Sequence, residues 1–257
     1  MKANSPDKPQ GKYQKRKSQR MVYLCCLLAL AITLALASGA YRFYAEDSAP
    51  AQAGAEVPVL SSGGESLTDP TAWNLMLVNP WHSLPSDHRV ALHSLGDGQA
   101  VDQRCYASLQ SMLEDCAAAG CQPHICSSYR TQAKQETLYN DKVQEFLAQG
   151  YTQARATAQA EEYVAKPGFS EHQLGLAVDI VDVNYQILDE AQETTAVQQW
   201  LLANSWRYGF ILRYPTAKHE ITGIMYEPWH YRYVGEEAAA EIYNQGLCLE
   251  EYLATLT

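Results

Sequence analysis

The chain has 257 residues, and 47% of them are hydrophobic, which is ample for a packed core and excludes an intrinsically disordered protein. Residues 1–20 carry seven Lys or Arg and one Asp, a net charge of +6. The rest of the chain therefore carries −16, against −10 for the whole. Phosphate backbones would repel so acidic a domain, so we expect no nucleic-acid partner.

An apolar segment follows this basic head. Residues 21–40 read MVYLCCLLALAITLALASGA, without one charge. A helix needs about 20 such residues to cross about 30 Å of hydrocarbon, so we predict a transmembrane signal-anchor helix over residues 21–41. Basic residues in front of it keep 1–20 in the cytoplasm and the chain behind it outside. A cleaved signal peptide is the alternative, because small residues suited to a signal peptidase end the segment.

Composition changes again after the apolar segment. Residues 42–72 are rich in Ala, Ser, Gly, Pro and acids, with little apolar periodicity, which predicts a flexible extracellular stalk. From Trp73 onward the chain is rich in aromatic and aliphatic residues, with no second linker of this kind. We therefore predict one catalytic-sized domain over residues 73–257.

Five of the seven cysteines lie in this last part, where an extracellular location would let disulfides persist. They are Cys105, Cys116, Cys121, Cys126 and Cys248. We expect two bridges, Cys116 with Cys126 and Cys105 with Cys248, although the sequence alone leaves the connectivity open. Zinc-finger spacing is absent, so a structural four-cysteine zinc site is not expected.

Apolar periodicity, together with glycines that stop helices, predicts the elements of this domain in chain order. Helices are expected at residues 106–119, 132–148, 152–165, 196–208 and 236–245. Strands are expected at residues 122–127, 174–182, 221–226 and 230–234. Helices and short strands in this irregular order predict an α+β fold with a small, mostly antiparallel sheet and flanking helices.

Asp179 is the first candidate for chemistry, in a segment that reads SEHQLGLAVD. A carboxylate in an apolar strand costs several kcal/mol if it is buried without a partner. Gly175 and Ala177 share its face and are small, which leaves room for an ion. His172 reaches the same point if its loop folds over the strand end. The residues alone leave two alternatives, a metal ligand or a structural Asp satisfied by backbone donors.

A second segment, EPWHYRY, begins at Glu227. A zinc peptidase needs three protein ligands, one open position for water, and a carboxylate that is not a ligand. His172, Asp179 and His230, with Glu227 as that carboxylate, match this count. Pro228 excludes a regular helix here, and the helical HExxH motif is missing. The alternative is an aromatic core strand with an exposed Glu.

A third segment, SSYRTQAKQ, places Arg130 at a junction of strand and helix. A guanidinium there can bind a carboxylate bidentately or stabilise an oxyanion, although surface arginines are common. The other histidines have no partner at a recognisable spacing, so no role is predicted for them. They are His82, His88, His93, His124 and His219. Cys126 lies beside this segment, where we expect a disulfide rather than a catalytic nucleophile.

Together and in this order, SxYR, SEHQxGxAxD and ExWH resemble the VanY-type D-alanyl-D-alanine carboxypeptidases, zinc enzymes that trim the stem peptides of bacterial peptidoglycan. The resemblance covers about residues 77–253. It implies a hedgehog/D-Ala-D-Ala-peptidase-like fold, with Zn²⁺ held by His172, Asp179 and His230 and with Glu227 as general base. One departure is Leu174, which stands where many relatives have Thr.

The same resemblance assigns the residues around the metal. It implies that Arg130 faces the scissile carbonyl or the terminal carboxylate, and that Ser170 and Gln135 lie near the substrate. The expected partner is a peptidoglycan stem peptide, and the expected protein is a monomer in the bacterial cell membrane with its catalytic domain outside. Three alternatives remain: an L,D-carboxypeptidase, an endopeptidase, and a non-catalytic wall-binding domain.

Overall fold

The computed structural model describes residues 69 and 71–257. The predicted basic head (1–20), the predicted anchor helix (21–41) and nearly all of the predicted stalk (42–72) lie outside the described residues. Within the part of the chain that is described, no helix is both long enough and apolar enough to cross a membrane.

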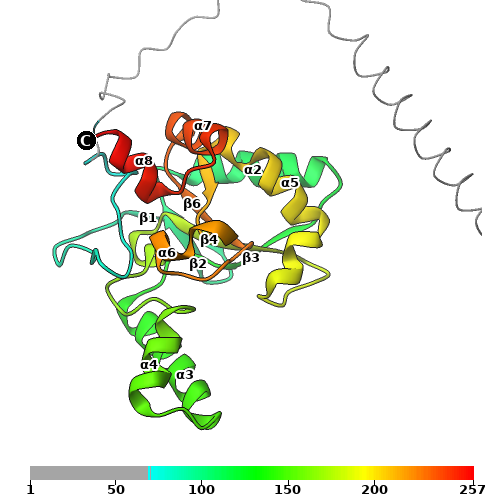
Figure 1. The fold of residues 1–257 in the computed structure, drawn as a ribbon. Coiled ribbons are helices and arrows are strands. Elements are labelled where there is room, and N and C mark those ends of the chain that lie inside the picture. Colours follow the sequence, from blue (N-terminus) through cyan, green and yellow to red (C-terminus); the bar gives the residue numbers. More distant parts are fainter. Residues whose placement is uncertain (1–68, 70) are drawn as a thin grey trace, which may run out of the picture. The chain divides into compact units, whose positions relative to one another are not determined.

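Four short strands form one antiparallel sheet, in which β4 and β6 are the central pair (Figure 1). In order across the sheet, they are β3 (Pro123–Ser127), β4 (Ala177–Asp182), β6 (His230–Tyr233) and β5 (Phe210–Leu212). All six residues of β4 are buried, so both of its faces are covered. The predicted α+β fold with a small antiparallel sheet is confirmed.

A separate hairpin pairs β1 (Leu92–Gly96) with β2 (Gln99–Asp102). Its two-residue turn is Asp97-Gly98, and both residues have positive φ, 50° and 78°. Such a turn matches the twist of the strands that it joins, and Asp-Gly is among its preferred sequences. This hairpin was not among the predicted elements, although the Asp-Gly pair is a signal for one.

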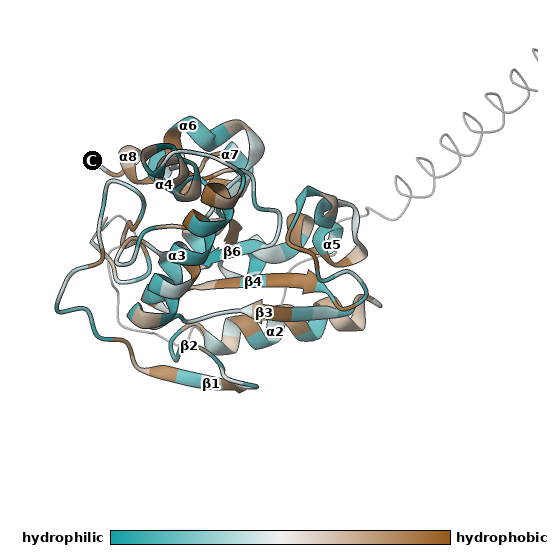
Figure 2. Cartoon of the chain, turned by 90° about the horizontal axis from the view of Figure 1, so that it is seen from below, coloured by the Kyte–Doolittle hydropathy of each residue, from teal (hydrophilic) through white to brown (hydrophobic). Residues whose placement is uncertain are grey.

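Helices cover one face of the sheet and bury its apolar side chains. Leu109 and Met112 of α2 and Leu201 of α5 join Val178 and Ile180 of β4 in one core. Each such side chain contributes about 1.5–3 kcal/mol on burial. This part of the fold contains α2 (Tyr106–Ala118), η2 (Glu190–Thr194), α5 (Ala196–Asn204) and η3 (Ser205–Tyr208). Figure 2 shows the apolar character of β4 along most of its length.

A helical hairpin projects from this body (Figure 1). It consists of α3 (Gln132–Ala148) and α4 (Gln153–Glu161), each capped at its N-terminus by the hydroxyl of a threonine. Its own small core contains Val143, Ala156 and Ala160.

The C-terminal part of the chain packs against β5 and forms a second core, which includes Ile211, Val234 and Ile242. Its helices are η4 (Thr216–Lys218), α6 (His219–Thr222), α7 (Glu236–Gln245) and α8 (Leu249–Thr255). The early segment with Leu75 packs into the same core, so the two ends of the described domain lie together.

Three predicted helices, 106–119, 132–148 and 236–245, are confirmed to within one residue. The strand predicted at 221–226 is wrong, because α6 occupies its start and Gly223 ends that helix with φ 75°. A side chain at Gly223 would lie 2.8 Å from the Pro80 ring, so glycine is required there.

Other predicted elements have shifted ends. The helix expected at 152–165 ends at Glu161, and the one expected at 196–208 continues beyond α5 as the 3₁₀ helix η3. The strand expected at 174–182 begins only at Ala177. The reason is Gly175, whose φ of 80° ends the 3₁₀ helix η1 (Glu171–Leu174) in a left-handed conformation that departs from extended strand geometry.

The expected disulfides are also wrong, because all five cysteines of the domain are free. Cys116 neighbours Cys121 and not Cys126: the Cys121 amide donates to the Cys116 carbonyl at 3.2 Å, where helix α2 ends. Cys126 lies on β3, with its Sγ 3.5 Å from the Asp179 carbonyl oxygen. Cys105 and Cys248 each precede a different helix, α2 and α8.

Candidate metal centre

A cavity of about 550 Å³ lies where β4, β6 and η1 meet the α3–α4 hairpin. Six of the seven predicted site residues line it: Arg130, Ser170, His172, Asp179, Glu227 and His230. Gln135 is not part of the lining, and neither is any of the five histidines for which no role was predicted. Residues far apart in the sequence therefore meet in one place.

Asp179 reaches this cavity because of its position in the sheet. Its neighbours Val178 and Ile180 point into the helix-covered core, and successive strand residues point to opposite faces. Its register partner on β6 is His230, whose Nδ1 lies 3.0 Å from Asp179 Oδ1. On its other side, the register between β3 and β4 shifts at Cys126, which brings Ser127 opposite Asp179.

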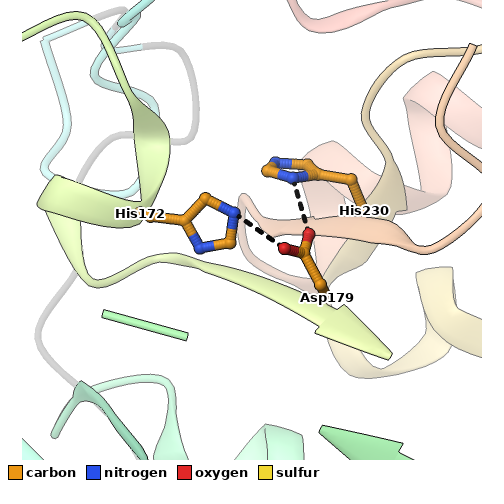
Figure 3. Close-up of side chains that lie close together, drawn as sticks. All are labelled: His172, Asp179 and His230. Atoms are coloured by element: carbon orange, nitrogen blue, oxygen red, sulfur yellow. Dashed lines mark hydrogen bonds and ion pairs between the residues drawn. The ribbon is translucent and has the colours of Figure 1, made fainter. Parts of the chain in front are cut away.

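His172 enters from η1 instead of from a strand. Its backbone places the ring at the end of β4, where Nε2 lies 3.3 Å from Asp179 Oδ2. The other ring nitrogen, Nδ1, is 2.8 Å from the carbonyl oxygen of Ser128 and must donate to it. Nε2 is thereby left with a free lone pair. Figure 3 shows both imidazoles pointing at the Asp179 carboxylate.

The site is buried, and its charges perturb one another. Burial by itself would raise the pKa of Asp179, but the two histidines and Arg130 hold that pKa well below its usual range. Burial and Arg130 lower the pKa of His172 to about 4. For His230 burial is outweighed by hydrogen bonds to Asp179 and Glu171, and its pKa rises to about 9. Near neutral pH Asp179 is therefore ionised and His172 is neutral, the states in which each can bind a metal.

A divalent metal fits this point. The ligand atoms of His172, Asp179 and His230 lie within 4.8 Å of one another, and all three residues are buried. Two imidazoles and one carboxylate are a donor set that zinc accepts, with a fourth position left open in catalytic sites. A cation would also neutralise the carboxylate charge, chiefly that of Asp179, that raises the pKa of His230.

Glu227 lies beside this set without belonging to it. Its Oε2 is 3.7 Å from His230 Nδ1, and a tight turn through Pro228 returns the chain from Glu227 to β6. Burial is the main reason that its pKa rises to about 8, with Asp179 adding to the effect and His230 opposing it. A buried carboxyl group with such a pKa can both take up and release a proton near neutral pH.

Arg130 is held over the site by three contacts. Its Nη2 donates to Asp179 Oδ2 at 2.8 Å, its Nε donates to Ser127 Oγ at 2.9 Å, and its Nη1 lies 3.5 Å from Gln135 Oε1. Gln135 is fully buried, and its Nε2 donates to the Ala165 carbonyl at 2.7 Å. Gln135 thus lies behind Arg130, and its predicted place near the substrate stays a prediction.

Sequence reasoning missed the residues behind His230. Glu171, Arg213 and Arg232 are all buried, and Glu171 lies 3.4 Å from His230 Nε2. Burial would raise the pKa of Glu171, but the two guanidiniums hold it below its usual range. A signal was present: residues 230 and 232 share a face of a strand, so a charged residue at 232 must find a partner near the site.

Taken together, the site contains three converging ligand atoms, a carboxyl group beside them and a guanidinium above them. Three protein ligands with an open position and a separate base are the parts of a hydrolytic metal centre. Fold and site together define a metallopeptidase.

The family model described as VanY: D-alanyl-D-alanine carboxypeptidase matches residues 98–236, and the chain belongs to this family. It is a D-alanyl-D-alanine carboxypeptidase of the VanY type. Over 188 residues it is 50% identical to the D-alanyl-D-alanine carboxypeptidase of Enterococcus faecalis, an alignment that covers 73% of this chain and 68% of the relative.

Two solved structures resemble this one closely. The structure of VanYB in complex with D-alanine-D-alanine is 50% identical, with a TM-score of 0.66, and the match covers 71% of this chain and 98% of that one. A variant of the vancomycin-resistance D,D-pentapeptidase VanY in complex with Zn(II) is also 50% identical. Its TM-score is 0.64, and the match covers 70% of this chain and 99% of that one.

Proposed function

We propose that this VanY-type carboxypeptidase holds one Zn²⁺ at His172, Asp179 and His230 and removes the C-terminal D-alanine from peptidoglycan stem peptides. The observation that carries the proposal is the convergence of these three buried ligand atoms within 4.8 Å, with Glu227 next to the set. Relatives of 50% identity were solved with Zn(II) and with D-alanine-D-alanine, which supports both the metal and the substrate class.

The chemistry divides between the metal and the residues around it. A bound Zn²⁺ supplies Lewis-acid polarisation and lowers the pKa of water. Glu227 takes one proton from the attacking water, whose oxygen forms a bond to the peptide carbonyl carbon. Glu227 then returns this proton to the nitrogen of the departing D-alanine as the C–N bond breaks.

In this scheme Arg130 stabilises negative charge and transfers no proton. An arginine has no proton to give near neutral pH, but its donors can hold an oxyanion or a terminal carboxylate. Arg130 lines the cavity and already contacts a carboxylate, that of Asp179. Ser170, buried at the start of η1, lines the same cavity, and we assign it to the substrate.

One experiment tests the reaction and its stereochemistry together. The full-length chain is incubated with pentapeptide stems that end in D-Ala-D-Ala and with tetrapeptide stems that end in a single D-Ala. Mass spectra should show loss of one alanine from the pentapeptide alone, and a chelator should abolish it. Cleavage of the tetrapeptide alone would identify an L,D-carboxypeptidase, and internal cleavage an endopeptidase. No cleavage of either peptide by the zinc-loaded chain would refute the proposed reaction and favour the non-catalytic alternative.

We also propose that the enzyme is anchored in the bacterial membrane with its catalytic domain outside. The support is the uncharged segment 21–40 behind the basic residues 1–20. Protease added to intact cells should remove the domain but leave the N-terminal segment with the membranes. Release of the whole chain in soluble form would instead indicate a cleaved signal peptide.

A further inference from the structure

Behind His230 lies a group of buried charges that the proposed reaction does not use. Arg213 and Arg232 are fully buried, Glu171 is 1% exposed, and Glu250 completes the group. We call these four residues the Glu171 cluster. Ions lose several kcal/mol each when they leave water, so a buried cluster persists only where its geometry satisfies every member.

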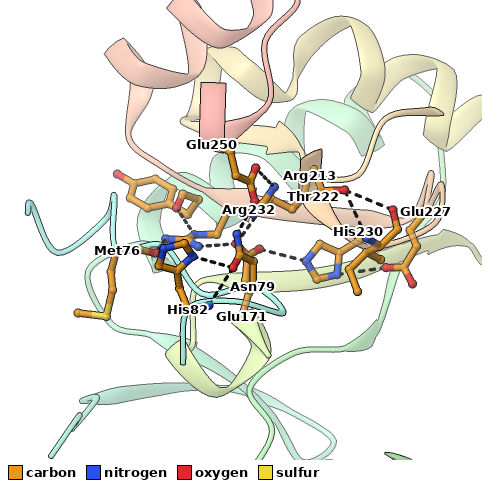
Figure 4. Close-up of polar contacts among 12 residues, drawn as sticks. Met76, Asn79, His82, Glu171, Arg213, Thr222, Glu227, His230, Arg232 and Glu250 are labelled. Carbon is orange, nitrogen blue, oxygen red and sulfur yellow. Dashed lines mark hydrogen bonds and ion pairs between the residues drawn. The ribbon is translucent and has the colours of Figure 1, made fainter. Parts of the chain in front are cut away.

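The two oxygens of Glu171 have different partners (Figure 4). Oε1 accepts from Arg213 Nε and from Arg232 Nη1, both at 2.7 Å. Oε2 lies 3.4 Å from His230 Nε2. One oxygen is therefore occupied by two guanidiniums, and the other is directed at the imidazole.

The two arginines are in turn held in place by parts of the chain remote from the site. Arg213 donates to both oxygens of Glu250 on α8, at 2.9 and 2.7 Å. Arg232 Nη2 donates to the carbonyl oxygens of Asn74 and Met76, at 3.0 and 2.9 Å. Glu171 thus cannot turn away from His230 without breaking its ion pairs with two guanidiniums that are fixed from the other side.

The orientation of His230 depends on which ring nitrogen carries the proton. Nδ1 faces Asp179 Oδ1 at 3.0 Å and belongs to the metal side, whereas Nε2 faces Glu171. A neutral imidazole binds a metal through the nitrogen without a proton, and the other nitrogen donates to a neighbour that fixes the tautomer. Both neighbours are carboxylates and can only accept, so without a metal each nitrogen of His230 carries a proton. A metal between His230 and Asp179 would displace the proton of Nδ1, and Glu171 would keep the one on Nε2.

We propose that Glu171 is a positioning residue: it fixes His230 as an Nδ1 ligand, and the two arginines hold Glu171 in place. The inference rests on the proposed zinc site. In His172 the roles of the two ring nitrogens are reversed: Nδ1 donates to the Ser128 carbonyl, and Nε2 faces the metal side. The two histidines thus bind through different ring nitrogens, and each has a different second partner.

The Glu171→Gln variant tests this role, because an amide cannot replace the carboxylate on both sides. If its oxygen accepts from the arginines, its NH₂ must face His230. If its oxygen accepts from His230, its NH₂ must face the arginines. If the NH₂ faces His230, it requires the lone pair on Nε2 and places the proton on Nδ1, where a metal would bind. The matched control is Glu250→Gln, which disturbs Arg213 in the same cluster but does not contact His230.

The measurement is zinc affinity of the full-length chain, determined by competition with a chromophoric chelator. Glu171→Gln should bind zinc about 10–100-fold more weakly than the unaltered protein, as expected when a partner of a metal-bound histidine is lost. Glu250→Gln should lower the unfolding temperature and weaken zinc binding much less than Glu171→Gln does, because Arg232 still holds Glu171. Equal affinities in all three proteins, or an equal loss in both variants, would show that the cluster is only structural.

A second measurement does not depend on how well a variant folds. The ¹⁵N spectrum of the zinc-loaded unaltered protein reports which nitrogen of His230 carries the proton. A proton on Nε2 supports the proposal, and a proton on Nδ1 overturns it even where zinc is bound. Absence of stoichiometric zinc in the unaltered protein would instead overturn the proposed function, and the inference with it.

Discussion

Asp179 on β4 and His230 on β6 are direct partners across an antiparallel pair, with Asp179 Oδ1 3.0 Å from His230 Nδ1. Two of the three candidate ligands are therefore fixed by the register of the sheet. A slip of one residue would turn either side chain to the opposite face, into the helix-covered core. Only His172 depends on an irregular segment, and the carbonyl of Ser128 holds its ring.

Replacement of His172 by Ala should remove the metal. Two protein ligands would remain, fewer than the three that catalytic zinc sites use. We expect zinc measured by atomic emission after dialysis to fall from about one ion per chain to nearly none. His124→Ala is the control, because His124 lies on β3 outside the cavity and should leave the zinc content unchanged. Full zinc content in the His172 variant would show that the ligand set is wrong.

Replacement of Glu227 by Gln should separate binding from turnover. The amide cannot take up a proton, and loss of a general base lowers kcat by about 10²–10⁴-fold. Zinc content should stay at one ion, since Glu227 is not one of the converging ligands. The measurement is the kcat for a pentapeptide that ends in D-Ala-D-Ala. The control is Glu114→Gln, on the exposed face of α2. A kcat near that of the unaltered enzyme would exclude Glu227 as the base.

Replacement of Arg130 by Ala should lower kcat by about 10²–10³-fold, the size of effect seen when one oxyanion donor is lost. Zinc should remain bound, because a guanidinium is not a metal ligand. Arg130→Lys should recover little, since a single ammonium cannot contact Asp179, Ser127 and the substrate at once. A change confined to KM would instead place Arg130 on the ground-state substrate alone.

Much of this site was accessible from the sequence. Asp179 is a carboxylate in an apolar strand, which indicates a buried partner. A zinc peptidase needs two further ligands and a separate carboxylate, and His172, His230 and Glu227 supply them. Spacing could not show that residues 172, 179 and 230 meet, because the meeting depends on the register of two strands and on the positive φ of Gly175. The resemblance of three ordered motifs filled this gap.

Other features could not be predicted in this way. Gln135 matches a position near the substrate, yet its side chain lies behind Arg130, a difference that depends on how α3 packs. Glu171 lies within one of the motifs, but no role could be predicted for it, because its partners Arg213 and Arg232 lie 42 and 61 positions later. Sequence patterns report periodicity and local spacing, whereas these contacts are long-range.

The Glu171 cluster also predicts how stability depends on pH. Burial would raise the pKa of Glu250, but Arg213 and hydrogen bonds hold it below its usual range. A group whose pKa is lowered by folding stabilises the fold above its unfolded pKa, about 4.3 for Glu. This contribution is lost as the pH falls below that value, through the lower pKa of the folded state.

Comparison of the unaltered protein with Glu250→Gln should show this dependence. At pH 7 the variant should be less stable by roughly 3 kcal/mol, because Arg213 keeps its charge but loses a buried partner. The difference should shrink below about pH 4, where the unaltered Glu250 also becomes protonated. Urea unfolding of the metal-free protein between pH 3 and pH 7 measures it, with chelator present so that zinc binding does not contribute. A difference that stays constant over this range would show that the charge of Glu250 does not stabilise the fold.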